Sequence, residues 1–152
     1  MIKLRNDVYA MYLGVEGRFW EISPTTYRLQ AEKTLYIPNG FENYDNADLM
    51  DKMYIDLPKN NYYSVYRINT YCNYMGDLYC IENIWNDLVV LSPEFETKKK
   101  LNMHIYDDKR IEVRYDNFIK DVEDIWEVRK PLEGFKFNVE PICYIKKNGE
   151  FI

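Results

Sequence analysis

One short phrase, in which two tyrosines precede a glycine, occurs twice in the chain and limits its fold more than any other feature. Residues 9–14 read YAMYLG and residues 71–76 read YCNYMG, so both have the form Tyr-x-x-Tyr-x-Gly. A shorter copy, PLEG, occupies residues 131–134, and a run with strand propensity follows each copy. The glycines recur at an interval of about 60 residues, and regular recurrence is the sign of an internal repeat. The phrase predicts two small β-rich modules and a C-terminal tail.

Strand-forming residues dominate both modules. The chain contains 15 Tyr, 7 Phe and 3 Trp, and aromatic rings pack well on the pleated surface of a sheet. Residues 52–57 alternate between apolar and polar side chains, as in a strand with one buried face. Asn148 and Gly149 are the strongest signal for a two-residue hairpin turn. Strands are predicted at residues 8–13, 18–22, 27–29, 35–37, 52–57, 62–68, 71–74, 78–81, 87–91, 101–105, 111–115, 126–128, 135–139 and 142–146.

One segment departs from strand periodicity. Between Asp116 and Trp126 the apolar residues recur at helical spacing, and the side chain of Asp116 can cap a helix N-terminus. One short helix is therefore predicted near residues 117–124. The predicted fold is mainly antiparallel β, with a first module over residues 1–69 and a second, including a C-terminal hairpin, over residues 70–152. If the repeat is coincidental, the alternative is one continuous antiparallel sheet with the helix against it.

The end of the first module resembles the end of an SH3-like barrel. Residues 56–68 contain a strand, a turn that begins at Pro58 and continues through residues 59–61, and a Tyr-rich strand. The resemblance implies that the two modules are small SH3-like or roll-like units in tandem.

Charge limits the classes of partner. With 20 basic and 25 acidic residues the net charge is −5, which works against general nucleic-acid binding because that affinity depends on neutralising phosphates. No apolar run has membrane-spanning length, and residues 1–7 lack the apolar core of a signal peptide. We therefore expect a cytoplasmic protein that binds neither nucleic acid nor membrane. The sequence leaves its oligomeric state open.

The chain has three cysteines, Cys72, Cys80 and Cys143. A hairpin that pairs Met75 with Leu78 sets Cys72 opposite Ile81, so the thiols of Cys72 and Cys80 do not face each other. A disulfide between them is not predicted, and reduced thiols fit a cytosolic protein.

The sequence contains no recognisable catalytic or ligand-binding motif. His104 is the only histidine, and we expect it on the solvent side of a strand, because a metal site needs several ligands. Residues 92–100 are predicted to form a loop that ends in three lysines, a solubilising flank rather than a nucleic-acid site. No phosphate-binding loop, dinucleotide fingerprint or EF-hand loop is present. We expect no metal, no cofactor, no catalytic residue and no enzymatic activity.

The whole chain resembles the small acidic immunity proteins of bacterial polymorphic toxin systems, through the repeated Tyr-x-x-Tyr-x-Gly phrase and residues 123–128 leading to Gly134. The resemblance implies a cytosolic inhibitor that occludes the active site of one cognate, basic toxin protein, with acidic side chains that pair with its Lys and Arg. The partner contacts that we predict are acidic and aromatic: Tyr62, Tyr63, Trp85, Glu94, Phe95, Glu96, Asp107 and Asp108. The alternative function is a tandem SH3-like module that binds peptides or acts as a scaffold without catalysis.

Overall fold

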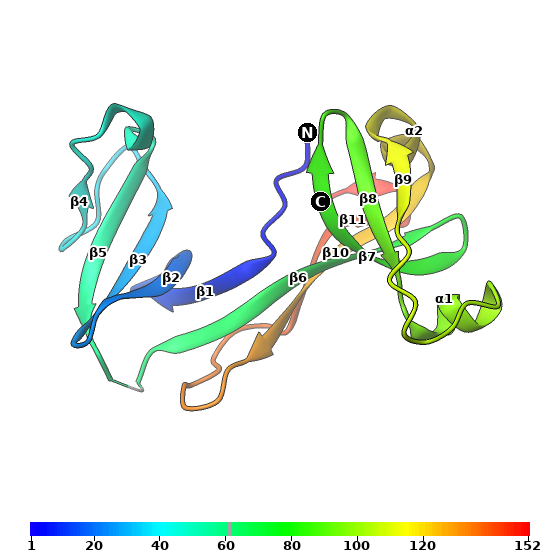
Figure 1. Ribbon diagram of the computed structural model, residues 1–152. Coiled ribbons are helices and arrows are strands. Elements are labelled where there is room, and N and C mark those ends of the chain that lie inside the picture. The colour runs from blue at the N-terminus through cyan, green and yellow to red at the C-terminus, as the bar shows by residue number, and fades with distance from the viewer. Residues whose placement is uncertain (61) are drawn as a thin grey trace. The chain divides into compact units, whose positions relative to one another are not determined.

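The computed structural model describes residues 1–60 and 62–152, which divide into two compact units. Both units consist mainly of antiparallel strands (Figure 1), which confirms the predicted fold class. Unit 1 contains Met1–Asn6, Ile68–Arg129 and Glu140–Ile152, and unit 2 contains Asp7–Arg67 and Lys130–Val139.

The two units are not two consecutive stretches of the chain, as two modules in tandem would be. The chain passes from unit 2 to unit 1 between Arg67 and Ile68, beside the predicted boundary at residues 69 and 70. The first six residues nevertheless belong to unit 1, and residues 130–139 return to unit 2. Residue 61 of the predicted turn at residues 59–61 lies outside the described residues.

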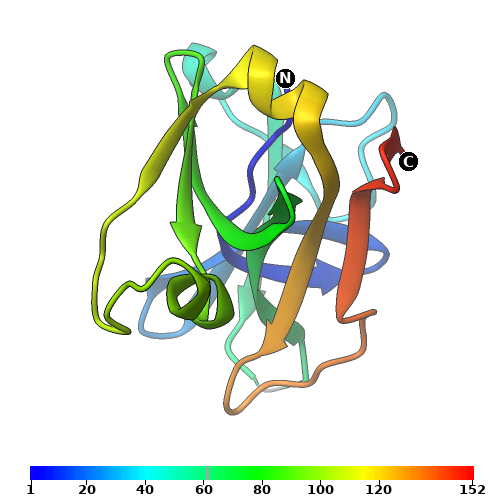
Figure 2. The same ribbon diagram turned by 90° about the vertical axis from the view of Figure 1, so that its right-hand side faces the viewer.

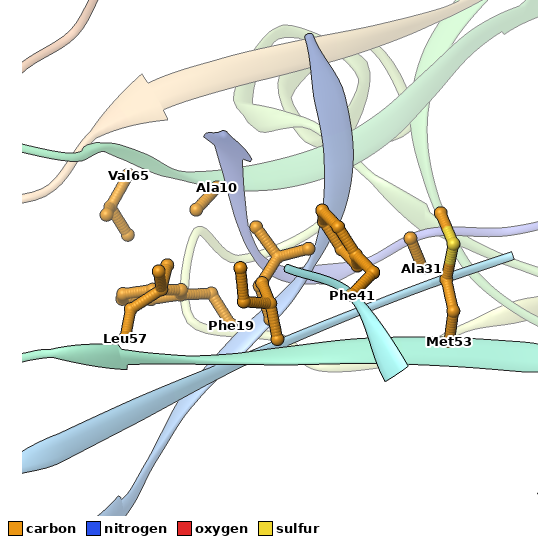
Figure 3. Packing of buried hydrophobic residues seen from close by; sticks show 9 residues of the cluster. Ala10, Phe19, Ala31, Phe41, Met53, Leu57 and Val65 are labelled. Carbon is orange, nitrogen blue, oxygen red and sulfur yellow. The ribbon is translucent and has the colours of Figure 1, made fainter. Parts of the chain in front are cut away.

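Unit 2 contains strands that pair in the order β1-β2-β3-β5-β4. The predicted alternation in β5 is confirmed, because Met53, Ile55 and Leu57 are buried while the residues between them are not. Their side chains pack against those of Phe19 and Leu29 to form the core of the unit (Figure 3). The elements are β1 (Asp7–Tyr12), β2 (Val15–Ser23), β3 (Thr26–Glu32), β4 (Glu42–Asn43), the 3₁₀ helix η1 (Ala47–Leu49), β5 (Lys52–Pro58) and the first residues of β6 (Ser64–Tyr74).

Unit 1 contains the rest of β6, which pairs with β10 and with β7. Its core includes Cys72, Ile81, Leu91 and Phe118. The helix α2 leads directly into β10, and β11 lies beside β10 (Figure 2). The elements are β7 (Asp77–Trp85), β8 (Leu88–Pro93), α1 (Phe95–Lys100), β9 (Ile111–Arg114), α2 (Tyr115–Asp121), β10 (Val122–Pro131), β11 (Ile142–Lys147) and β12 (Glu150–Phe151).

Two-residue turns with left-handed backbone join neighbouring strands. Positive φ at both central residues defines a type I′ turn, whose twist matches that of the flanking strands. The turns of this kind are Leu13-Gly14, Met75-Gly76, Asn86-Asp87 and Asn148-Gly149. The predicted hairpins of the first two phrases and of Asn148-Gly149 are therefore confirmed.

The third phrase behaves differently. Phe135 N donates to Leu132 O at 3.2 Å, and within this turn φ is positive at Gly134, at +86°. The residues that follow form an isolated bridge between Lys136 and Ser64, so the strand predicted at residues 135–139 is wrong. Phe135 packs its ring on that of Phe19, with 6.1 Å between the ring centres, so this segment contacts the core of unit 2 through a side chain rather than through a strand ladder.

Three local predictions differ from the structure. The predicted loop at residues 92–100 contains the helix α1, and the strand predicted at residues 101–105 is absent. The strand predicted at residues 35–37 is also absent, because Leu35 and Tyr36 are exposed and have no cross-strand partner to cover them. The helix predicted near residues 117–124 is confirmed, but it occupies Tyr115–Asp121 because β10 begins at Val122.

The register of the second hairpin differs from the predicted one by two residues. Tyr74 pairs with Asp77 across the turn, and Cys72 pairs with Tyr79. The prediction placed Gly76 first in the turn, whereas the left-handed Met75 occupies that position. Cys72, Cys80 and Cys143 are free thiols.

Candidate functional site

The structure distributes the predicted contact residues over separate places. Tyr62 and Tyr63 precede β6 in unit 2. In unit 1, Trp85 ends β7, while the predicted acidic residues lie at the start of α1 and in the segment that follows it. Leu78, at the other end of β7, holds α1 through the hydroxyl of Thr97, which donates to Leu78 O at 2.7 Å. The length of β7, roughly 20 Å, therefore separates Trp85 from α1.

The predicted acidic residues at the start of α1 and in the segment of residues 101–110 lie among basic ones, because residues 94–110 contain four acidic and five basic side chains. Met103 N donates to Lys98 O at 2.8 Å, and Lys98 Nζ donates to Ile105 O at 3.2 Å, so the segment folds back on the helix. The side chains of Phe95, Glu96 and Asp108 are exposed, and those of Glu94 and Asp107 are half-buried.

The basic residues of α1 moderate this acidity. Lys99 Nζ lies 3.9 Å from a carboxylate oxygen of Glu96 and 5.3 Å from the ring centre of Phe95. Lys100 Nζ donates to Asp77 Oδ1 at 2.8 Å. Two of the three lysines thus pair with neighbouring carboxylates, and we expect each of these exposed pairs to contribute little to stability.

Tyr63 lies in an aromatic cluster of unit 2. Its ring centre lies 6.2 Å from those of Tyr12 and Phe19 and 6.4 Å from that of Tyr27. Its hydroxyl donates to Pro58 O at 2.8 Å, and burial raises its pKa. Tyr62, by contrast, is exposed, with Lys136 Nζ 5.2 Å from its ring centre.

The outward side of β7, β8 and β9 carries three apolar side chains, Trp85, Leu88 and Val90, among polar and charged ones. Trp85 pairs with Leu88 across the Asn86-Asp87 turn, and Leu88 pairs with Arg114. Directly paired residues of antiparallel strands lie on the same face of the sheet. We call this surface the Trp85 face; it consists of Trp85, Leu88 and Arg114 and of the next row, Asn83, Val90 and Glu112.

The Trp85 face points away from the core of unit 1. Val89 and Leu91, which alternate with its residues, are fully buried in that core. Trp85 is 69% exposed, whereas Leu88 and Val90 are half-buried. The sequence singled out Trp85 but not its neighbours, because they join it only through the pairing of β7, β8 and β9.

A groove of about 630 Å³ in unit 1 is lined by apolar side chains and by the ion pair of Arg5 and Glu127. Arg5 donates to both carboxylate oxygens of Glu127, through Nη2 at 2.7 Å and Nε at 2.9 Å. Arg129 Nη2 donates to Glu127 Oε1 at 3.4 Å. The carboxylate of Glu127 thus joins the N-terminal segment of unit 1 to β10.

The structure places Cys72 in the core of unit 1 and His104 in an exposed position. Cys72 is buried, and burial raises its pKa to about 12, so its thiol stays protonated at neutral pH. His104 lies in the segment of residues 101–110 rather than on the predicted strand, and its Nδ1 accepts from Tyr106 N at 3.2 Å. Within residues 1–60 and 62–152, no three His, Cys, Asp or Glu side chains are grouped as metal ligands would be.

Comparison with known proteins gives no relative: no family model, curated protein or solved structure matches the chain. No helix in the described part of the chain combines the length and apolar character needed to cross a membrane.

Proposed function

We propose that this chain is a bacterial immunity protein that stays in the cytosol, has no catalytic activity and neutralises one cognate toxin by covering its active site. The observation that carries the proposal is the exposed Trp85 on the Trp85 face. A tryptophan that keeps most of its surface in water gains a large apolar contact when a partner covers it.

The neighbours of Trp85 suit the centre of a protein interface. Leu88 and Val90 extend the apolar surface along β8. Residues of this kind around an aromatic anchor exclude water and allow the anchor to dominate the binding energy. The surrounding polar rim includes Asp87 and Glu112, both exposed.

The charge of the chain favours a basic partner. The net charge is −5, and Glu96 and Asp108 are exposed carboxylates of the same unit. Carboxylates in such positions attract a Lys- and Arg-rich surface over several ångströms and speed association more than they add affinity. The toxin's catalytic groove, if it binds a phosphate-bearing substrate, has this basic character.

The test is co-expression with the product of the gene immediately upstream. We expect that product to arrest growth alone, to be harmless beside this chain, and to co-purify with it. Trp85→Ala should then weaken binding at least 30-fold, the effect of losing an interface anchor, and should restore toxicity. Tyr36→Ala, which removes an even more exposed ring from unit 2, is the matched control and should leave protection unchanged.

A harmless neighbour that does not co-purify would contradict the immunity proposal. The alternative is a peptide-binding module, which the aromatic cluster of Tyr12, Tyr27 and Tyr63 favours, since these rings are only half-buried. Such a module would bind many extended peptides weakly rather than one protein tightly. Tyr27→Ala, and not Trp85→Ala, would then reduce binding in a pull-down from cell lysate.

A further inference from the structure

The strand β9 forms an open edge of unit 1. It pairs with β8, and among the described strands no other pairs with it. Both views show β9 at the margin of its sheet (Figures 1 and 2). An open edge presents unpaired backbone N–H and C=O groups to solvent, which makes it a template for another strand.

The hydrogen bonds of this edge identify the residues whose backbone faces outward. Tyr115 N donates to Asp87 O at 2.7 Å, so the amide just after β9 points toward β8. Backbone groups of successive residues in a strand point to opposite edges. The amide of Val113 therefore also faces β8, whereas those of Glu112 and Arg114 face away from the sheet.

The side chains of these two residues carry opposite charges. Glu112 and Arg114 both lie on the Trp85 face and are both exposed. Within the described residues, neither side chain has a hydrogen bond or ion-pair partner. A strand that reads Glu-Val-Arg is complementary to itself when a second copy runs antiparallel to it.

We propose that β9 pairs with β9 of a second copy of this chain, in an antiparallel dimer with its twofold axis at Val113. Glu112 of each copy lies opposite Arg114 of the other, and each of these pairs exchanges both of its backbone N–H···O bonds. The two cross-strand ion pairs lie on the Trp85 face, between Leu88 of one copy and Val90 of the other. Opposite charges in direct cross-strand pairs stabilise a sheet, and like charges destabilise it.

The charges of Glu112 and Arg114 determine which strand can pair with the edge of β9. An arbitrary strand could satisfy the backbone, but only a partner with the order Arg-x-Glu read antiparallel pairs both side chains. The second copy provides this order by symmetry. The dimer is an association of the chain with itself and does not depend on the toxin partner proposed above.

The experiment is sedimentation equilibrium of the full chain up to about 1 mM, because a short strand edge gives a weak interface. We expect the mass to rise with concentration from that of one 18.5 kDa chain toward that of two. Glu112→Arg alone and Arg114→Glu alone should each weaken dimerisation at least about tenfold, since each sets like charges opposite each other. Glu133→Arg, the same change of charge on an exposed turn of unit 2, should have no effect.

Mixing the two single variants gives the sharper result. Glu112→Arg carries only positive charges at the edge and Arg114→Glu only negative ones, so the mixture should form a heterodimer at least as well as the unmodified chain. The double variant Glu112→Arg/Arg114→Glu should recover self-association. Circular dichroism of each variant shows that its fold is intact. A chain that stays monomeric over the whole range, or a dimer that the single reversals leave unchanged, would overturn the proposal.

Discussion

The two complete copies of the Tyr-x-x-Tyr-x-Gly phrase form hairpins with the same turn and the same register. In β1–β2 the pair Tyr12–Val15 flanks a type I′ turn, and in β6–β7 the pair Tyr74–Asp77 does so. Each pair of the first hairpin has its counterpart at the same position of the second. The phrase therefore specifies a turn and a register.

The inward-facing pairs of the two hairpins are very different. In the first hairpin Ala10 pairs with Gly17, and in the second Cys72 pairs with Tyr79. A side chain at Gly17 would collide with the neighbouring strand β3, whereas Tyr79 is a buried member of the core of unit 1. The local phrase thus sets the hairpin, whereas its surroundings decide the size of the inward-facing residues: the adjacent strand β3 in the first hairpin and the core of unit 1 in the second.

The largest effect on stability should come from adding a side chain at Gly17, where β2 lies against β3. A Cβ at Gly17 would lie 2.7 Å from Leu29 Cδ2 and closer still to the backbone oxygen of Gln30. Because a strand backbone cannot yield as a side-chain end can, Gly17→Ala should lower the free energy of unfolding by about 3 kcal/mol. Urea denaturation measures the loss.

Gly14→Ala is the matched control in the same hairpin. A Cβ at Gly14 meets nothing within 4 Å, but the backbone there has a φ of +79°. Its cost should be only that of a left-handed residue, about 1 kcal/mol. Equal losses for the two variants would show that close packing does not explain the glycine at position 17.

Raising the pH should have an intermediate effect on the free energy of unfolding, through Cys72 of the second hairpin. Burial raises the pKa of Cys72 to about 12 from an ordinary value of 9.0, so folding favours the protonated thiol. The stability that this provides is complete below pH 9.0 and is lost as the pH rises toward 12. At pH 10 the unfolding free energy should have fallen by about 1 kcal/mol through this group.

Cys72→Ala separates this contribution from that of the tyrosines and lysines that titrate in the same range. The variant should have a shallower fall in stability between pH 9 and 11 than the unmodified chain. Alkylation with iodoacetamide at pH 8 gives a second measurement, in which Cys80 and Cys143 should react at least about 100-fold faster than Cys72. Comparable rates for all three thiols would contradict the burial of Cys72.

The sequence predicted what depends on near neighbours. Strand class, the alternation in β5, the existence of the hairpins and the Asn148-Gly149 turn follow from side-chain periodicity and from the left-handed preference of Gly and Asn, whereas the exact turn residues of the second hairpin did not. The helix α1 was missed because its six residues, with three lysines, lack an apolar period. Leu101, Met103 and Ile105 alternate like a strand, but none of the described strands pairs with them. Alternation within one segment does not show whether a partner strand lies beside it.

The candidate site was predictable only in part for the same reason. Trp85 stands out in the sequence as an aromatic residue beside a turn. Trp85 shares a face of the sheet with Leu88, Val90 and Glu112 because of the registers of β7–β8 and β8–β9. The β7–β8 register includes a shift near Glu82. A shift of one residue reverses the face of every side chain that follows, so no composition or motif could have placed these residues together.

The smallest effects should come from the turns that the two hairpins share. Leu13 and Met75 occupy the first left-handed position, with φ of +49° and +54°, and their side chains are 72% and 68% exposed. A left-handed backbone strains both residues, whereas Asn adopts it readily, and neither side chain has burial to lose. Leu13→Asn and Met75→Asn should therefore each raise the free energy of unfolding by about 0.5–1 kcal/mol in urea denaturation. Leu13→Ala, which keeps the strain, should give no such gain. If one Asn variant stabilises the chain and the other destabilises it, the two turns are not energetically equivalent. The two hairpins would then share only their register.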